Sequence, residues 1–348
     1  MYKAFLRPLL FLFDPEKVHH FIVWTVKLMG SIPGLIYMVR KYFVYTSPRL
    51  KVEVAGLEFA NRVGMAAGFD KNADFYDEFT MFGFSFLEIG TVTPMPQPGN
   101  LKPRLFRLPD DRALINRMGF NNKGVNYAAH QLKKRKGSVI IGGNIGKNTE
   151  TPYEKAGEDY ISCFITLYDH VDYLTVNVSC PNIAGLEKLQ NKESLREILL
   201  GITQERSKKP VRKPVFLKIS PDLSFAQIDD ILSLYNEVGL DGIIATNTTT
   251  TRINLNTRED RISRIGQGGL SGSPLKDRTL KIISYICKQT HNAIPVIGVG
   301  GILNPRDAID MIKAGASLLQ VYTGFVYEGP FIVRRINKAI DTYFLNKH

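Results

Sequence analysis

Eight short apolar segments, spread over most of this chain, limit its fold more than any other feature. They comprise residues 63–67, 85–90, 139–143, 172–178, 214–220, 241–247, 295–299 and 317–322. Their near-continuous apolar character is typical of strands that are buried on both faces. Helical patterns lie between several of them, for example at 226–238 and 306–314, and such alternation predicts a parallel sheet. Eight is the number of strands that a closed parallel barrel needs.

The segments therefore predict an α/β chain whose body is a (β/α)8 TIM barrel. A doubly wound open sheet is the main alternative. The first predicted strand is not followed by the G-x-G-x-x-G pattern of a dinucleotide-binding fold, which weakens that alternative. The chain has 348 residues, 44% of them hydrophobic, which is enough for one large barrel or two ordinary domains.

Glycine or polar residues occur at the end of every predicted strand. In chain order they lie at 68–71, 90–91, 142–148, 177–182, 218, 246–248, 298–301 and 322–324. Barrel enzymes build their sites at this end of the strands, and they often bind phosphate after the seventh and eighth strands. Glycines let the backbone approach an anion closely there. The pattern predicts a site for a phosphate-bearing ligand, with tight turns and no ligand as the alternative.

The fourth strand end, at residues 177–182, combines two carboxamides and a thiol within six residues. Each amide offers both a donor and an acceptor, so Asn177 and Asn182 can grip a planar ligand with imide-like edges. The thiol of Cys180 can move a proton or attack a carbon. A free thiol titrates near 8.5, so it is a plausible proton acceptor. A strand followed by an ordinary polar turn is the alternative interpretation.

Cysteine usage indicates a reducing compartment and no metal centre. Cys163, Cys180 and Cys287 are few, odd in number and far apart, and no C-x-x-C spacing suggests zinc. We therefore expect no disulfide framework and no bound metal. Buried, inert thiols are the expected state of Cys163 and Cys287.

The N-terminal segment, residues 1–45, differs from the rest in both charge and hydropathy. Residues 1–51 carry eight Lys or Arg and two acids. The difference between these counts is half of the chain's net charge of +12. Asp14-Pro15-Glu16 predicts a helix start, and apolar side chains follow at helical spacing. No apolar run reaches the roughly 18 residues of a membrane-spanning helix, and no signal-peptide cleavage site follows. Aromatic apolar faces flanked by Lys and Arg predict helices that lie in a membrane interface, although packing against the barrel is the alternative.

Six motifs, taken together and in order, resemble those of the dihydroorotate dehydrogenase family. They lie at residues 66–71 (AAGFDK), 116–121 (NRMGFN), 177–182 (NVSCPN), 245–249 (ATNTT), 268–272 (GGLSG) and 298–301 (GVGG). The match runs over nearly the whole chain. The resemblance implies a β/α barrel, bound FMN, and oxidation of (S)-dihydroorotate to orotate in de novo pyrimidine (UMP) biosynthesis.

The N-terminal segment is similar to that of the class 2, quinone-using, membrane-associated branch of the family. Residues 14–19 (DPEKVH) resemble the start of that branch's second N-terminal helix, and residues 102–107 (KPRLFR) resemble its arginine-bearing segment beside the quinone tunnel. Cys180 is a departure, because class 2 members usually carry serine there and soluble class 1 enzymes carry cysteine. The implied division is 1–45 for membrane and quinone binding and 46–348 for the FMN-binding catalytic barrel.

The resemblance also implies a role for individual residues. Cys180 would be the base, and Lys218 would place a cation beside the flavin ring. The implied substrate-binding residues are Lys71, Asn116, Arg117, Met118, Gly119, Phe120, Asn177, Asn182, Asn247 and Thr248. The implied FMN contacts are Ala67, Gly68, Thr91, Asn144, Asn177, Lys218, Thr246, Gly272, Gly301, Tyr322 and Thr323. His19, Arg107 and Tyr322 would lie near the quinone.

Three alternatives to this interpretation remain at the level of the sequence. A soluble-acceptor, class 1-like dihydroorotate dehydrogenase would not need residues 1–45. An FMN barrel that reduces tRNA uridines would also be basic and use a cysteine, but it would carry its positive charge around the site or on an added RNA-binding domain, not on an apolar N-terminal pair of helices. A non-catalytic membrane-binding barrel would bind no flavin. The favoured expectation is a peripheral protein on the cytoplasmic side of the inner membrane, with dihydroorotate and a quinone as partners and no nucleic acid.

Overall fold

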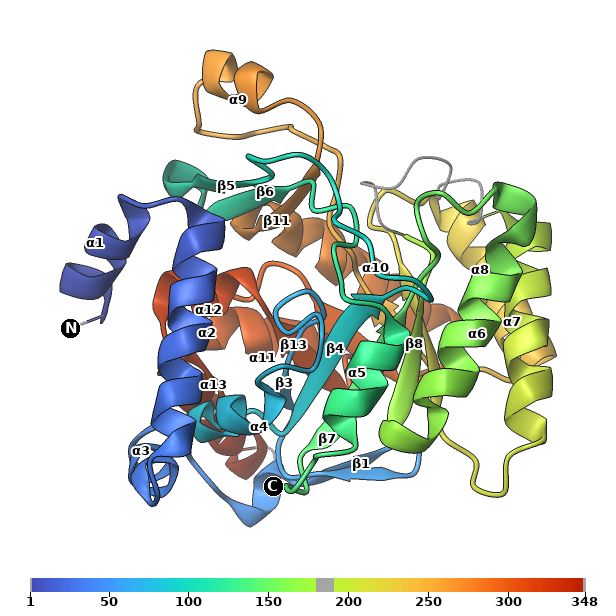
Figure 1. Ribbon diagram of the computed structural model, residues 1–348, viewed down its shortest axis with the longest axis horizontal. Coiled ribbons are helices and arrows are strands. Elements are labelled where there is room, and N and C mark those ends of the chain that lie inside the picture. Colours follow the sequence, from blue (N-terminus) through green and yellow to red (C-terminus); the bar gives the residue numbers. More distant parts are fainter. Residues whose placement is uncertain (1, 180–190, 347–348) are drawn as a thin grey trace.

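A closed barrel of eight parallel strands forms the body of the molecule in this computed structural model, which describes residues 2–179 and 191–346 (Figure 1). The strands are β3 (Val63–Met65), β4 (Phe86–Val92), β7 (Ile140–Ile145), β8 (Tyr173–Asn177), β9 (Val215–Ile219), β10 (Gly242–Ala245), β12 (Val296–Val299) and β13 (Leu318–Val321). Each strand pairs with the next barrel strand along the chain, and β13 closes the barrel against β3. The predicted TIM barrel is confirmed, and every strand overlaps its predicted segment, with β4 and β7 each extending two residues beyond it.

Helices surround the barrel and cover the outer faces of its strands (Figure 1). The longer ones are α5 (Val125–Leu132), α6 (Ala156–Leu167), α7 (Lys192–Ser207), α8 (Phe225–Val238), α10 (Lys276–Gln289), α11 (Pro305–Lys313) and α13 (Ile332–Leu345). Two of them begin with reciprocal capping boxes, formed by Ser224 with Gln227 and by Asn304 with Asp307. These boxes satisfy backbone N–H groups that have no partner within the helix. They explain why both helices begin where the sequence patterns predict.

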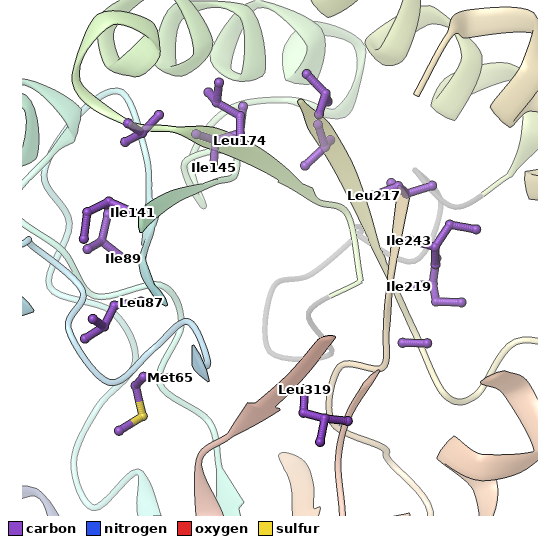
Figure 2. Packing of buried hydrophobic residues seen from close by; sticks show 14 of the residues in the cluster. Met65, Leu87, Ile89, Ile141, Ile145, Leu174, Leu217, Ile219, Ile243 and Leu319 are labelled. Atoms are coloured by element: carbon purple, nitrogen blue, oxygen red, sulfur yellow. The ribbon is translucent and has the colours of Figure 1, made fainter. Parts of the chain in front are cut away.

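Alternate side chains along the barrel strands point to opposite sides, as the period of two requires. The outward set packs beneath the surrounding helices (Figure 2). It includes Met65, Leu87, Ile89, Ile141, Ile145, Leu174, Leu217, Ile219, Ile243 and Leu319. This layer is fully apolar, which is why the strand sequences look almost continuously hydrophobic.

The inward set fills the amino-terminal half of the barrel, called here its lower half, with aromatic rings. Phe86, Tyr173 and Phe216 belong to an inner cluster that also contains Val54 and Phe59. The last two residues come from the hairpin of β1 (Val52–Val54) and β2 (Leu57–Phe59), which closes the amino-terminal end of the barrel. The rings need glycines opposite them: a Cβ on Gly142 would lie 2.1 Å from the Tyr173 ring. The lower barrel is therefore a packed core, and only its upper end can hold a ligand.

A small antiparallel sheet, which the sequence patterns did not predict, lies over the upper end of the barrel. Its strands are β5 (Leu105–Leu108), β6 (Ala113–Asn116) and β11 (Gly269–Gly272), in the order β11-β6-β5. β6 pairs with both neighbours, so it joins two segments that lie more than 150 residues apart in the chain. The sheet brings the motifs at 116–121 and 268–272 over the barrel strands.

The N-terminal segment begins with a π-helix, Tyr2–Leu6, and then forms three α-helices along one side of the barrel, at the blue end of the chain in Figure 1. They are α1 (Arg7–Phe11), α2 (Pro15–Ser31) and α3 (Leu35–Phe43). The Asp14 side chain accepts a hydrogen bond from the Lys17 N–H at 2.9 Å, so the predicted helix start is confirmed. Within the described residues, no single helix is long and apolar enough to cross a membrane. Only α2 and α3 together meet that standard, and they are bent by 117°.

The N-terminal helices, including the π-helix, and their connections expose many large apolar side chains. The exposed set in this segment is Phe5, Leu6, Leu9, Leu12, Phe13, Phe21, Trp24, Leu28, Ile32, Tyr37, Met38 and Tyr42. We call this set the N-terminal apolar surface. In contrast, Val26 is buried, and the Phe43 ring lies 4.6 Å from the Phe331 ring and 5.6 Å from the Phe82 ring. The helices therefore pack on the barrel through one face and leave a second apolar face exposed.

Candidate active site

One cavity opens at the carboxyl ends of the barrel strands, and most of the predicted site residues line it. Its empty volume is about 1110 Å³, which includes the space at its open mouth. The predicted residues that line it are Ala67, Gly68, Lys71, Thr91, Asn116, Met118, Gly119, Phe120, Asn177, Lys218, Thr246, Asn247, Thr248, Gly272, Gly301, Tyr322 and Thr323. Five of the six family-like motifs thus meet in one place, and the sixth enters it through Asn177. Cys180 and Asn182 lie outside the described residues.

A network of carboxamides crosses the cavity wall from β8 to β10. The Asn247 Nδ2 donates to Asn177 Oδ1 at 3.2 Å and to Ser179 Oγ at 3.0 Å. The Asn177 Nδ2 donates to Thr91 Oγ1 at 2.9 Å. Ser179 Oγ in turn donates to the Lys218 carbonyl at 2.8 Å. These bonds fix the amide planes before a ligand binds, which suits recognition of a planar group with alternating donors and acceptors.

A polar layer lies inside the barrel, below this network, and the sequence analysis predicted only two of its members, Asn144 and Lys218, as site residues. Glu88, Asn144, Lys218 and Gln320 point inward from four different strands, and each is at most 5% exposed. The Asn144 Nδ2 and the Gln320 Nε2 each donate to the Glu88 carboxylate at 2.7 Å. The sequence contained a signal for Glu88, because it lies two residues after the inward-facing Phe86. The cavity therefore has a charged, hydrogen-bonded floor.

The glycine-rich strand ends leave backbone exposed at the far end of the cavity. Gly301, after β12, has φ of 83°, and a Cβ there would lie 2.4 Å from the Cα of Lys276. Gly272, at the end of β11, has φ of 103°, and a Cβ there would lie 2.4 Å from the Arg112 carbonyl oxygen. No other residue type adopts these conformations without strain. The glycine-rich strand ends that were predicted to receive a phosphate thus line the cavity, next to Thr323.

Two of the predicted contact residues do not line the cavity. The Arg117 guanidinium lies over the Phe106 ring at 4.8 Å and donates to the Pro103 carbonyl at 3.1 Å. Asn144 is fully buried and reaches the cavity through two residues that line it: Thr91 Oγ1 donates to Asn144 Oδ1 at 2.5 Å, and Asn177 Nδ2 donates to the same oxygen at 3.2 Å. Arg117 therefore braces the small sheet, and Asn144 supports the cavity floor.

Lys71 lines the cavity and also feels the charges of an ion pair, Arg104 with Glu16, that involves the N-terminal helix α2. Its Nζ donates to Asn121 Oδ1 at 2.9 Å. Burial, together with the nearby Arg104 guanidinium, lowers the pKa of Lys71 to about 8. Arg104 pairs at 2.8 Å with the buried carboxylate of Glu16 on α2. This ion pair joins the first turn of α2 to the segment that leads into β5.

The residues predicted beside the quinone lie between the barrel and the N-terminal helices. Edge-to-face contacts link the His19 ring to Phe69 at 4.9 Å and the Phe69 ring to Tyr322 at 5.4 Å. Arg107 lies over the Phe11 ring at 4.5 Å and donates to the Phe13 carbonyl at 2.7 Å. Tyr322 also lines the cavity. An aromatic connection thus runs from the cavity to α2.

Comparison with known proteins decides the family. The family model described as dihydroorotate dehydrogenase matches residues 49–344. The chain belongs to the dihydroorotate dehydrogenase family. A dihydroorotate dehydrogenase (quinone) from Christiangramia forsetii is 48% identical over 340 residues, covering 98% of both chains. Another, from Coxiella burnetii, is 44% identical over 97% of this chain and 96% of its own.

Solved structures of dihydroorotate dehydrogenase have the same fold. The Eimeria tenella enzyme in complex with ferulenol aligns with a TM-score of 0.84 at 36% identity, over 96% of this chain and 92% of its own. The ligand-free form of that enzyme aligns with a TM-score of 0.83. Enzymes of the dihydroorotate dehydrogenase family are flavin-dependent in general. The long matches to the curated relatives include the N-terminal helices as well as the barrel.

His19 gives this dihydroorotate dehydrogenase a pH-dependent stability. Burial, helped by the charges of Lys71 and His20, lowers the pKa of His19 from 6.5 to about 4, and Glu16 opposes the shift. A lowered pKa favours the neutral ring in the folded state, so this contribution is complete above pH 6.5 and is lost as the pH falls toward 4. We expect unfolding free energy to fall by on the order of 1–2 kcal/mol between pH 7.5 and pH 5 on this account.

Urea unfolding of the wild type and of His19→Gln at both pH values measures this contribution. The variant should lose less stability on acidification than the wild type. His130→Gln, at an exposed position on α5, is the control and should behave as the wild type. An identical pH dependence in His19→Gln and the wild type would contradict the prediction.

Proposed function

We propose that this chain is a class 2 dihydroorotate dehydrogenase, which oxidises (S)-dihydroorotate to orotate and passes the electrons through FMN to a quinone. The observation that carries the proposal is the convergence of the family's motif residues in one cavity, with the N-terminal helices attached beside it. Curated relatives at 43–48% identity bear the name of the quinone-dependent enzyme, which does not favour a soluble acceptor. The reaction belongs to de novo pyrimidine biosynthesis.

FMN fits the residues that the cavity presents. Ala67, Gly68 and Thr246 would hold the ring system from the strand ends. Gly272 and Gly301 line the cavity without side chains, so their backbone N–H groups would face a phosphate bound there. When bound, FMN supplies the hydride acceptor for the reaction. Lys218, at the floor, holds a positive charge where negative charge would develop on reduction.

Dihydroorotate has ring amides and a carboxylate, and the remaining cavity residues match both. Asn116, Asn177 and Asn247 offer paired donors and acceptors for the ring edges, while Lys71 offers a cation for the carboxylate. Forming the C5–C6 double bond requires loss of a proton from C5 and a hydride from C6. We assign the proton to the thiolate of Cys180, two positions before Asn182 in the sequence.

The N-terminal segment, residues 1–45, would form the membrane-facing and quinone-binding part, with residues 46–348 as the FMN-binding barrel. Class 2 enzymes are typically membrane-associated. The N-terminal apolar surface and the excess of Lys and Arg in this segment support peripheral attachment to the cytoplasmic side of an inner membrane. His19 and Tyr322, which flank Phe69, would lie along the path from the quinone to the flavin.

Membrane attachment predicts a specific loss of function in a surface variant. Combined Phe21→Gln, Trp24→Gln and Leu28→Gln on α2 should weaken binding to anionic lipid vesicles by at least about tenfold, because each side chain loses apolar burial in the lipid. Vesicle co-sedimentation measures binding, and dihydroorotate-driven reduction of a soluble dye should remain unchanged. Ile165→Gln with Val211→Gln, at exposed positions on the barrel, is the matched control. Equal vesicle binding by the α2 variant and the wild type would refute this surface as the attachment site.

Orotate formation with different acceptors tests the proposed reaction. The purified protein should be yellow, and it should form orotate from dihydroorotate with a soluble quinone analogue but not with fumarate or NAD as acceptor. Equal rates with fumarate would favour the class 1-like alternative. A colourless protein that cannot be loaded with FMN would favour a non-catalytic barrel.

A further inference from the structure

Glu88, near the middle of β4, is a buried carboxylate to which the proposed reaction gives no role. It is 1% exposed, and both of its oxygens have partners. Its Oε1 accepts from Asn144 Nδ2 at 2.7 Å and lies 3.8 Å from Lys218 Nζ. Its Oε2 accepts from Gln320 Nε2 at 2.7 Å and from the Tyr173 hydroxyl at 3.2 Å. A carboxylate with hydrogen bonds from three strands and an ion pair from a fourth is part of a built arrangement.

The charge of Glu88 is balanced by Lys218 alone. Across the described ranges 2–179 and 191–346, neither residue forms an ion pair with any other partner. Burying a single charge is costly, and breaking a buried pair by removing one partner leaves an uncompensated charge. Tyr173 adds no charge, because burial and the adjacent carboxylate raise the pKa of its hydroxyl well above the usual range. Each of the two charges therefore determines the electrostatic environment of the other.

Glu88 acts on the cavity from below. It does not line the cavity, but two of its partners do, namely Lys218 and Gln320. The Gln320 Oε1, at a residue only 1% exposed, has no hydrogen-bond partner among the described residues. The amide is held by its Nε2 on Glu88, so the orientation of this free acceptor is also fixed by Glu88.

We propose that Glu88 is a positioning residue, the fixed counter-charge that holds Lys218 and Gln320 at the floor of the flavin pocket and sets the net charge that the ring of FMN meets. The proposal rests on the proposed binding of FMN in this cavity. It predicts that the carboxylate makes the bound flavin harder to reduce, because it offsets the cation that favours the negatively charged reduced form.

The variant Glu88→Gln keeps the shape of the side chain and removes its charge. The unpartnered Oε1 of Gln320 allows the network to adjust, since this amide can turn and accept from the new amide. Lys218 then faces the ring without its counter-charge. We expect the equilibrium constant for two-electron reduction of the bound FMN to rise about tenfold, a midpoint potential about 30 mV higher. Spectroelectrochemical titration of the FMN-loaded enzyme measures it.

A double-variant cycle separates this role from simple support of the fold. Lys218→Met leaves Glu88 as an unpaired buried anion and should weaken FMN binding to the apoprotein by at least about tenfold. Adding Glu88→Gln removes both charges and should restore the dissociation constant to within about threefold of the wild type, because replacing a whole buried pair is often nearly neutral. Tyr173→Phe is the matched control, since it deletes one donor to the same carboxylate and leaves both charges in place.

The outcomes discriminate between the possibilities. A raised potential in Glu88→Gln, an unchanged potential in Tyr173→Phe, and rescue of Lys218→Met by Glu88→Gln would support the proposal. If Glu88→Gln fails to fold but the double variant folds and binds FMN, that result also supports the pairing of the two charges, because removal of the second charge restores the fold. An unchanged potential in Glu88→Gln, or a double variant that binds FMN more weakly than either single variant, would overturn it. A wild-type protein that binds no FMN would instead refute the proposed function.

Discussion

Replacing Cys180 with alanine should slow flavin reduction by dihydroorotate by about two to four orders of magnitude, the usual contribution of a general base. The variant should still bind orotate almost normally, because Asn177 and Asn247, which would hold the ring edges, are fixed by hydrogen bonds to Thr91 and Ser179. Cys180→Ser should keep part of the activity with its optimum at higher pH, since a hydroxyl is a weaker acid than a thiol.

Stopped-flow flavin reduction between about pH 6 and about pH 10 measures both effects. Cys287→Ala is the matched control. Its thiol is buried on α10, outside the barrel, and burial raises its pKa to about 11. The control should reduce flavin at the wild-type rate. If Cys180→Ala also does so, another residue is the base.

Replacing Lys218 with methionine should have the second largest effect. The side chain keeps its length but loses the charge that lies at the cavity floor, and Glu88 is left without its cation at 3.8 Å. Loss of one preorganised electrostatic contact costs about 3 kcal/mol, or roughly a hundredfold in rate. At saturating FMN, we therefore expect flavin reduction by dihydroorotate to be about a hundredfold slower.

Rapid-mixing measurements on enzyme reconstituted with excess FMN test this expectation separately from cofactor loss. Lys208→Ala, which removes a lysine from an exposed pair with Glu205 on the outer surface, serves as the control. The assignment of Lys218 to the flavin site would be refuted by a variant with wild-type flavin content and wild-type reduction rate.

The barrel could be predicted from the sequence because its strands are short, apolar and regularly separated by helical patterns. Each of the eight strands lies within or close to its predicted segment, and the capped helix starts at Ser224 and Asn304 agree with the patterns. Barrel topology then brings the strand ends together, so side chains as distant as Lys71 and Thr323 meet in one cavity. The site followed from the fold and from the motifs jointly.

Other parts of the structure could not be read in this way. The sheet of β5, β6 and β11 depends on pairing between segments that are distant in the chain, and no local sequence pattern predicts such pairing. Glu88 was missed because its segment is otherwise apolar, and only the strict alternation of the strand places it inside the barrel. Arg117 lies within a motif, but its side chain turns away to Phe106 and Pro103. A motif fixes neighbouring backbone more reliably than it fixes every side chain.

The N-terminal segment shows how an apolar pattern can serve two surfaces. Its spacing predicted helices, and α2 begins at the predicted cap. The same residues divide between burial, as at Val26, and exposure, as at Trp24. Sequence periodicity alone could not assign the second face, because a helix that is apolar on both sides suits either a core or a lipid surface. Vesicle binding by the α2 variant distinguishes these two uses of the exposed face.

Anaerobic half-reactions test the central claim most directly. The purified enzyme is mixed with dihydroorotate without oxygen while flavin absorbance is followed, and a quinone or fumarate is then added. We predict stoichiometric bleaching by dihydroorotate, rapid recovery of the absorbance with the quinone, and no recovery with fumarate. Absence of bleaching by dihydroorotate, or recovery with fumarate as fast as with the quinone, would contradict the account.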